Sequence, residues 1–573
     1  MNENPKVYNV VPFARDAGFL RTRAQGHARA GRMLEALELY RMAAERAPDN
    51  ALRQLELAAQ YGRMGAYELS NRILFSLLQR GEHVAAVFFT LGSNFYAVQD
   101  AWRAQDCLLA LAQIQPEGEF SEQSEEMMDQ LDELLTSEHG QGRAGKAMLR
   151  GIAALEAGQA DAAVRWIGYA VQHGGADAEG MAMLAFAHIA GGDAREGLIW
   201  ARRARRRSRH SVPALCAMAC AFYALGNPLL CARYLDFAEE EAELPQEMAL
   251  LCQSACETGS HDLVLSLLRR VHASQPYVPG MLHMMAAACW NTGQLRQAAQ
   301  YWGTLTRLDP DNLTARILHE RARQRAAEGG DLQEPPGPEE LCNYNMELSV
   351  EDTIDQLFSV QRAIHEGPEG LQRRFDADTE LAALLAWGLT VRDAEDGTRR
   401  AMLSLLAHLR GERADRILLA QLTEAGQSEE IRREALGLLA LRGLDGPFYM
   451  ECGGRIVRAV GRPAGGNVSL PRNCERVLQA AVDRMTPRYG DVVCEASDLW
   501  LAYARDHLRE PVHRPQIWVA ALECAFRIMR GLPPRFRQIA AQASISSRTL
   551  RRHTRKLLGA LAMSTCEREE SGI

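Results

Sequence analysis

The chain has 573 residues and a net charge of −8, and 47% of its residues are hydrophobic although only 6% are aromatic. Small aliphatic residues in this proportion are typical of packed helical arrays, and the length suffices for several domains. The sequence contains no run of about 18 apolar residues that would predict a transmembrane helix. The first residues lack the pattern of a signal peptide. We therefore expect a cytoplasmic protein without membrane contact.

No arrangement of residues points to catalysis. The thirteen cysteines stand singly or four apart, as in Cys216/Cys220 and Cys252/Cys256, and no CxxC pair occurs. This spacing places both thiols on one helix face, which favours buried, reduced side chains over a metal site. The HExxH and GxSxG motifs are absent and the fifteen histidines are scattered. We therefore expect no enzyme activity, no metal, no cofactor and no small-molecule substrate.

Glycines recur about every 34 residues through the first half of the chain. The ladder consists of Gly31, Gly65, Gly158, Gly192, Gly226, Gly259 and Gly293, with Gln99 in the slot after Gly65. A fixed period of this length indicates stacked supersecondary units that present a binding surface, rather than one globular core.

Each period has the composition of a helix–turn–helix unit. In residues 17–50 small and apolar side chains recur at helical spacing on both sides of Gly31, and Pro48 closes the unit. The pattern resembles the tetratricopeptide repeat (TPR), and residues 279–312 resemble it as well. Eight such units extend over 17–312. The resemblance implies an all-α fold with two superhelical arrays, at 17–118 and 144–328, that bind a protein or peptide ligand in a groove.

An acidic segment and linker at 119–143 separate the two arrays. Phe120, Met127, Leu131, Leu134 and Leu135 fall at helical spacing. The helix either caps the first array or forms a mobile acidic element that competes for a groove. The following Gly140–Ala147 resembles a phosphate-binding loop, but Ala147 replaces the hydroxyl residue and no strand precedes it, which favours a linker.

Beyond the arrays we expect an exposed, proline-rich linker at 329–348 and a helical region at 349–462 that weakly resembles HEAT repeats. Two short β-prone runs flank Gly453-Gly454 and predict a hairpin over 447–461.

The C-terminus is basic. Nine arginines and lysines and no acidic residue lie between Cys524 and Cys566. The sequence predicts helices at 472–486, 491–507 and 514–530, followed by a helix–turn–helix. In that motif Ser546 caps the second helix and the packed side chains are those of Ile539, Ala540, Leu550 and Leu557. The exposed side chains are those of Arg548, Arg551, Arg552 and Arg555.

The segment 470–562 resembles the cyclin-box repeat of TFIIB-type transcription factors, through Arg514-Pro515, Ala520-Ala521, Ile539-Ala540 and the Ser546/Thr549 pair. This resemblance implies a helical bundle that either binds nucleic acid through those four arginines or docks on protein. A second basic run, Arg202–Arg209, either decorates a solvated helix face or contacts RNA or an acidic protein.

Counting through the TPR-like units assigns candidate groove residues. These residues are Arg21, Gln25, Arg29 and Arg63 in the first array, and Phe186, Tyr223 and Trp290 in the second. The second set suits an apolar or helical peptide. We therefore favour a helical-repeat scaffold or adaptor, with a nucleic-acid-binding regulator as the alternative.

Overall fold

A computed structural model describes the chain from residue 16 to residue 570 apart from internal gaps. The gaps are 116, 140–142, 157, 175–176, 330, 332–335, 392–395, 425, 445–447, 453–454, 460–475, 479, 482–483, 486–498, 501–502, 504–513 and 530–534. The fold is all-α with one small sheet among these residues, as predicted. Contacts divide the chain into two compact units, Met1–Ala464 and Gly465–Ile573.

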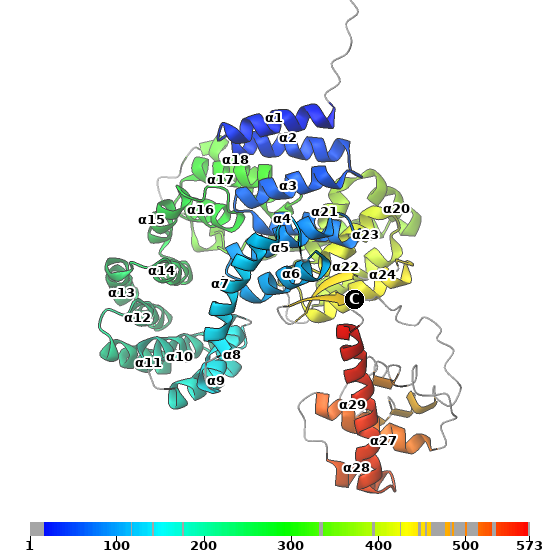
Figure 1. The fold of residues 1–573 in the computed structure, drawn as a ribbon. Helices are drawn as coiled ribbons and strands as arrows, with labels where there is room; N and C mark the ends of the chain where they lie inside the picture. Colours follow the sequence, from blue (N-terminus) through cyan, green and yellow to red (C-terminus); the bar gives the residue numbers. More distant parts are fainter. Residues whose placement is uncertain are drawn as a thin grey trace, which may run out of the picture. The chain divides into compact units, whose positions relative to one another are not determined.

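The first array consists of three helical hairpins and a long closing helix (Figure 1). The helices are α1 (Ala17–Arg29), α2 (Met33–Arg46), α3 (Ala51–Arg63), α4 (Tyr67–Gln79), α5 (Val84–Ala97), α6 (Ala101–Ile114) and α7 (Ser121–His139). Helix α7 packs on this array: Phe120 stacks on Phe89 with ring centroids 4.5 Å apart, and Leu131 is buried. The acidic segment is therefore a cap of the first array, the first of the two predicted alternatives.

The second array adds five hairpins and a final helix (Figure 1). Its helices are α8 (Arg143–Glu156), α9 (Ala160–His173), α10 (Ala178–Ala190), α11 (Ala194–Arg207), α12 (Val212–Ala224), α13 (Pro228–Glu241), α14 (Pro245–Glu257), α15 (His261–His272), α16 (Pro279–Asn291), α17 (Leu295–Leu308) and α18 (Leu313–Gly329). Gly145 and Lys146 lie inside α8, so the segment that resembles a phosphate-binding loop is helical from Arg143 onward.

The glycine ladder marks the turns within these hairpins. All seven ladder glycines have φ between 67° and 84°, in the left-handed region that costs glycine nothing. Gln99 holds the same position in the third hairpin with φ 61°. The predicted eight helix–turn–helix units are confirmed, and the geometry is that of a helical-repeat protein.

The middle region is helical with one hairpin, as predicted. It comprises the 3-10 helix η1 (Pro338–Glu340), α19 (Val350–Ile364), α20 (Gly367–Ala377), α21 (Thr379–Gly388), α22 (Gly397–His408), α23 (Glu412–Gln421), α24 (Glu429–Leu441), β1 (Phe448–Cys452) and β2 (Arg455–Ala459). The two strands are antiparallel, with Phe448 opposite Ala459. No described helix is both long and apolar enough to span a bilayer.

The first array contacts the end of the second. Tyr61 donates its hydroxyl proton to the Leu308 carbonyl at 3.0 Å, and Arg41 donates to the carbonyls of Leu308 and Arg307 at 2.8 and 3.0 Å. Arg307 in turn pairs with Glu38 at 2.8 Å. These carbonyls end α17 and lack helical partners. Side chains from more than 200 residues upstream therefore complete the C-terminus of α17.

The first array also contacts the hairpin of the middle region. Gln79 exchanges hydrogen bonds of 3.1 and 3.3 Å with the backbone of Tyr449, whose ring lies edge-on to Phe88 at 5.6 Å. Arg455 forms a bidentate pair with Asp106. The segments 17–118, 144–328 and 349–462, which we expected as separate regions, thus lie within one compact unit.

The second unit contains the basic C-terminus. Its described helices are α27 (Pro515–Met529), α28 (Phe536–Gln542) and α29 (Ser547–Glu570). Helix α27 matches the expected 514–530, whereas most of the expected helices 472–486 and 491–507 lies outside the described residues. The predicted core is confirmed, because Ile539, Ala540, Leu550 and Leu557 are all buried.

Arg72 on α4 links three segments of the first unit. Its guanidinium lies 2.9 Å from Glu424 and 3.5 Å from Asp309, two carboxylates that are both largely buried. Burial raises the pKa of the Asp309 carboxyl, and the charge of Arg72 opposes that shift. The arginine therefore compensates two acidic groups that have little access to water.

We predict that Arg72→Ala lowers the stability of the first unit by about 1–3 kcal/mol, because it leaves both carboxylates buried without a counter-charge. Thermal unfolding followed by circular dichroism measures this effect. The matched control is Arg80→Ala, which removes an exposed pair with Glu82 near the end of the same helix and costs less than about 0.5 kcal/mol. Equal effects of the two variants would contradict the prediction.

Candidate peptide-binding groove and basic C-terminal helix

The first helices of the units form one face of the second array, and we call this the first-helix face. Tyr223 and Trp290 each lie three residues before the turn glycine of their own unit, Gly226 and Gly293, so they hold equivalent positions. Tyr223 on α12 is 49% exposed, whereas Trp290 on α16 is 5% exposed. Phe186 on α10 is half-buried. The face is thus open at Tyr223 and covered at Trp290.

Trp290 is covered by a segment that we expected to be an exposed linker. Residues 338–348, which we call the strap, begin with η1 and run across α16. The Trp290 indole donates to the Glu340 carbonyl at 2.8 Å. The prediction that Trp290 is available to a partner is therefore wrong for this arrangement of the chain. The covering residue Glu340 lies 50 residues downstream of Trp290. The 34-residue repeat pattern therefore could not predict this contact.

The strap bends at Tyr344–Met346, where Met346 has φ 27°, and alternate side chains along it are turned toward the array. The inward-facing residues are Cys342, Tyr344, Met346 and Leu348, which pack against the hydrophobic core. The intervening residues are exposed. Burial therefore alternates with a period of two along residues 341–348, through the bend. This alternation was present in the sequence and was the signal that could have revealed the strap.

Asn291 holds the strap through its backbone. Its Oδ1 accepts from the Cys342 N–H at 2.8 Å, and its Nδ2 donates to the Cys342 carbonyl at 2.9 Å. The Asn291 side chain is buried, so both groups would otherwise lack partners. One amide side chain therefore satisfies both polar groups of one strap residue, independently of the identity of that residue.

His283 adds a second contact to the strap backbone. Trp302 donates its indole N–H to Nδ1 of His283 at 3.2 Å, and the Met346 N–H lies 3.0 Å from Nε2. That nitrogen is 3.1 Å from the Asn343 carbonyl. Burial lowers the pKa of His283 to about 4. Protonation at Nδ1 would direct an N–H against the Trp302 N–H, so the strap contact requires the neutral imidazole.

The far end of the strap reaches α15. The Tyr344 hydroxyl lies 2.7 Å from Nδ1 of His261. Burial raises the pKa of Tyr344 and lowers that of His261. Arg325 pairs with Glu340 at 2.7 Å and lies over the Trp290 ring, 5.9 Å from its centroid. The strap is thus bound by aromatic, amide and basic groups along its length.

The candidate residues of the first array do not form such a site. Arg21 pairs with Glu56, which also accepts from Arg53. The remaining candidates are Gln25, which is half-buried, and Arg29 and Arg63, which are exposed. The pairing with Glu56 neutralises Arg21, so this face carries less positive charge than the sequence suggested.

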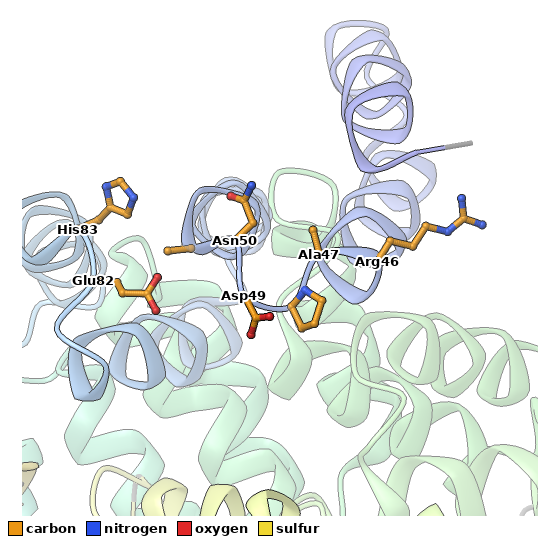
Figure 2. Close-up of a pocket in the computed structure, with 8 residues that line it drawn as sticks. Arg46, Ala47, Asp49, Asn50, Glu82 and His83 are labelled. Atoms are coloured by element: carbon orange, nitrogen blue, oxygen red, sulfur yellow. The ribbon is translucent and has the colours of Figure 1, made fainter. Parts of the chain in front are cut away.

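A recess of about 560 Å³ lies between two successive turns of the first array (Figure 2). Figure 2 shows Asp49, Asn50 and His83 around it and Arg46 pointing away. Asn50 already caps α3 by accepting from the Arg53 N–H at 3.3 Å. Within the described part of the chain, no three histidine, cysteine or acidic side chains gather closely enough to hold a metal. The recess offers mixed polar groups without a reactive cluster.

The described cysteines are free thiols, most of them buried. Burial raises the pKa of Cys216 to about 12 and that of Cys342 to about 12. A thiol with so high a pKa is not a thiolate at neutral pH and does not act as a nucleophile. These cysteines behave as small apolar side chains, as the sequence predicted.

The basic helix α29 presents the four arginines predicted for it. Arg548, Arg551, Arg552 and Arg555 are all exposed. None of the four forms an ion pair with a carboxylate of the described residues; Arg551 lies over the Phe536 ring at 5.2 Å. The Ser546 hydroxyl accepts from the Thr549 N–H at 3.0 Å, which confirms the predicted cap.

The second basic run lies on α11. Arg205 donates to the Tyr234 hydroxyl at 2.9 Å, and Arg203 lies 4.5 Å above the Trp200 ring. The other arginines of the run are exposed. The structure therefore agrees with a solvated helix face that stacks on its aromatic neighbours.

Comparisons with known proteins add two distant structural similarities. No family model matches the chain, and no curated protein sequence matches it. The TPR2AB domain of yeast Sti1 in a complex with pHSP90 is 17% identical, over 42% of this chain and 98% of that one, with a TM-score of 0.21. The TPR domain of P58(IPK) is 13% identical, over 55% and 98%, with a TM-score of 0.22. Neither structure serves as a template for a ligand of this chain.

We predict that the stability of the first unit falls as the pH decreases from about 6.5 toward 4. The folded state holds His283 neutral with a pKa of about 4, whereas the unfolded state binds the proton near 6.5. Stability from this group is complete above the unfolded pKa and is lost below it, to a total of about 3 kcal/mol.

Urea unfolding followed by tryptophan fluorescence at a series of pH values measures this loss. His283→Gln removes the titrating group, so its midpoint should change less over the same pH interval. A wild-type midpoint that follows the variant's pH dependence would refute the assignment.

Proposed function

We propose that this chain is a non-catalytic adaptor of the cytoplasm that binds a protein partner on the first-helix face of its second array. The observation that carries this proposal is the strap. The face already holds a segment of polypeptide through Asn291, His283 and Trp290. TPR-like arrays present such faces to peptides, and aromatic side chains there act as binding hot spots.

The open part of the face lies on α10 and α12. Tyr223 holds the position that Trp290 uses to bind the strap carbonyl, and its side chain is half exposed. Phe186 lies on the preceding first helix. A partner that continues along this face meets both aromatic rings, which offer apolar area with little side-chain entropy to lose.

We predict that Tyr223→Ala and Phe186→Ala weaken partner binding by about 1–3 kcal/mol each without loss of helical content. The partner is first captured on the immobilised full chain, identified by mass spectrometry and purified, and its affinity is then measured by calorimetry. The matched control is Leu229→Ala, which removes an 84% exposed apolar side chain at the start of α13. Unchanged affinity for both aromatic variants would exclude this part of the face.

A second candidate function concerns the cyclin-box-like C-terminal unit. It rests on one observation: Arg548, Arg551, Arg552 and Arg555 are exposed on one helix and unpaired with described carboxylates. A capped helix that follows a tight turn and carries arginines is suited to phosphate contacts. We therefore propose nucleic-acid binding by α29 as the alternative activity.

We predict that the full chain retards a labelled mixed-sequence DNA duplex and that the affinity falls with salt. The logarithmic slope should become shallower by about 0.9 for each of the four arginines replaced by glutamine. Fluorescence anisotropy measures the slope, and a duplex RNA of the same sequence distinguishes the two nucleic acids.

The matched control for this experiment replaces Arg202, Arg206, Arg207 and Arg209 by glutamine, which removes the same charge from the end of α11 and the turn after it. Loss of binding in this control alone would assign the activity to α11 instead. Absence of retardation at low salt would remove the alternative function altogether.

A further inference from the structure

The strap is bound chiefly through main-chain atoms. Asn291 contacts the N–H and the carbonyl of Cys342, and Trp290 donates to the carbonyl of Glu340. None of these contacts depends on a strap side chain. Recognition of this kind is open to another polypeptide whose inward-facing side chains fit and whose backbone adopts the same bend, as in other modes of backbone-directed peptide binding.

The side chains then set the chemistry of the ligand. Cys342, Tyr344 and Met346 alternate inward, so the face takes apolar side chains at every second position. Arg325 pairs with Glu340, so the face also accepts an acidic residue on the N-terminal side of the apolar ones. An acidic residue followed by alternating apolar residues is the ligand pattern that these contacts define.

The strap does not fill the face completely. A cavity of about 80 Å³ remains, lined by Trp290, Trp302, Leu318 and Cys342 among others. Leu341, which also lines this cavity, is 40% exposed. Native interiors leave few such voids because unfilled space forfeits dispersion contacts. A polypeptide with larger inward side chains would therefore make contacts that the strap does not.

We propose that the strap is an internal ligand of the first-helix face, and that the external partner is a segment of another protein that displaces it. This segment has an acidic residue followed by apolar side chains at alternate positions. The inference rests on the proposed adaptor function and adds the chemistry of the ligand and the self-occupancy of the site. The tethered strap competes at a high effective concentration, so the intact chain binds such a segment weakly.

The test uses the full chain and a fluorescein-labelled synthetic peptide of residues 336–350 as the probe. Tyr344→Ala removes the ring and hydroxyl that meet His261 and leaves the receptor face unchanged. We expect this variant to bind the probe at least about ten-fold more tightly than the wild type in an anisotropy titration. Adding Asn291→Ala to the same chain should abolish the gain. Asn345→Ala, an exposed strap residue, should behave as the wild type does.

Hydrogen–deuterium exchange of 338–348 verifies release of the strap. Met346→Ala is a second release variant that keeps the Tyr344 ring, in case the first destabilises the chain. The proposal is overturned if exchange in the strap increases while the probe binds no more tightly. It is also overturned if both variants lower the melting temperature of the whole unit without releasing the strap, because the strap is then a structural tie. Partner binding that still depends on Tyr223 would leave the adaptor function standing in either case.

Discussion

Polar groups that the helical repeats cannot satisfy for themselves determine how the first unit is assembled. The Leu308 carbonyl at the end of α17 accepts from Tyr61 and Arg41, and the buried Asn291 side chain bonds both backbone groups of Cys342 in the strap. A buried amide or carbonyl without a partner costs about 1–3 kcal/mol. Segments far apart in sequence must therefore come together before the helices of the second array are fully stable. The strap and the first-helix face that binds it are for this reason parts of one folded arrangement.

The sequence predicted what is local. The glycine ladder predicted each turn because a left-handed residue is needed at every hairpin, whatever the neighbours do. The core of the C-terminal helix pair and its Ser546 cap were predicted because their contacts span a few residues. Helical period and capping chemistry suffice for such elements.

The burial and pairing of residues that contact distant segments of the chain were not predicted. Trp290 has the same helical position as Tyr223, and only the strap distinguishes a buried ring from an exposed one. The proline-rich start of 329–348 concealed the alternation of Cys342, Tyr344 and Met346 that follows it. Arg21 was expected to line the groove, but Glu56 on the next hairpin pairs with it. In each case the partner that sets the burial or the charge of the residue lies outside the repeat to which that residue belongs.

The contact between Tyr61 and Leu308 has a consequence for how this chain can evolve. An open solenoid gains or loses a repeat with little effect, since each unit contacts only its neighbours. Here the Tyr61 side chain, in the first array, donates a hydrogen bond to the Leu308 backbone carbonyl, 247 residues downstream at the end of the second array. Inserting or deleting one 34-residue unit between them would displace one contact surface from the other. The number of repeats is thus fixed by geometry, and variation among descendants of this sequence should concentrate in inter-helix turns and surface residues.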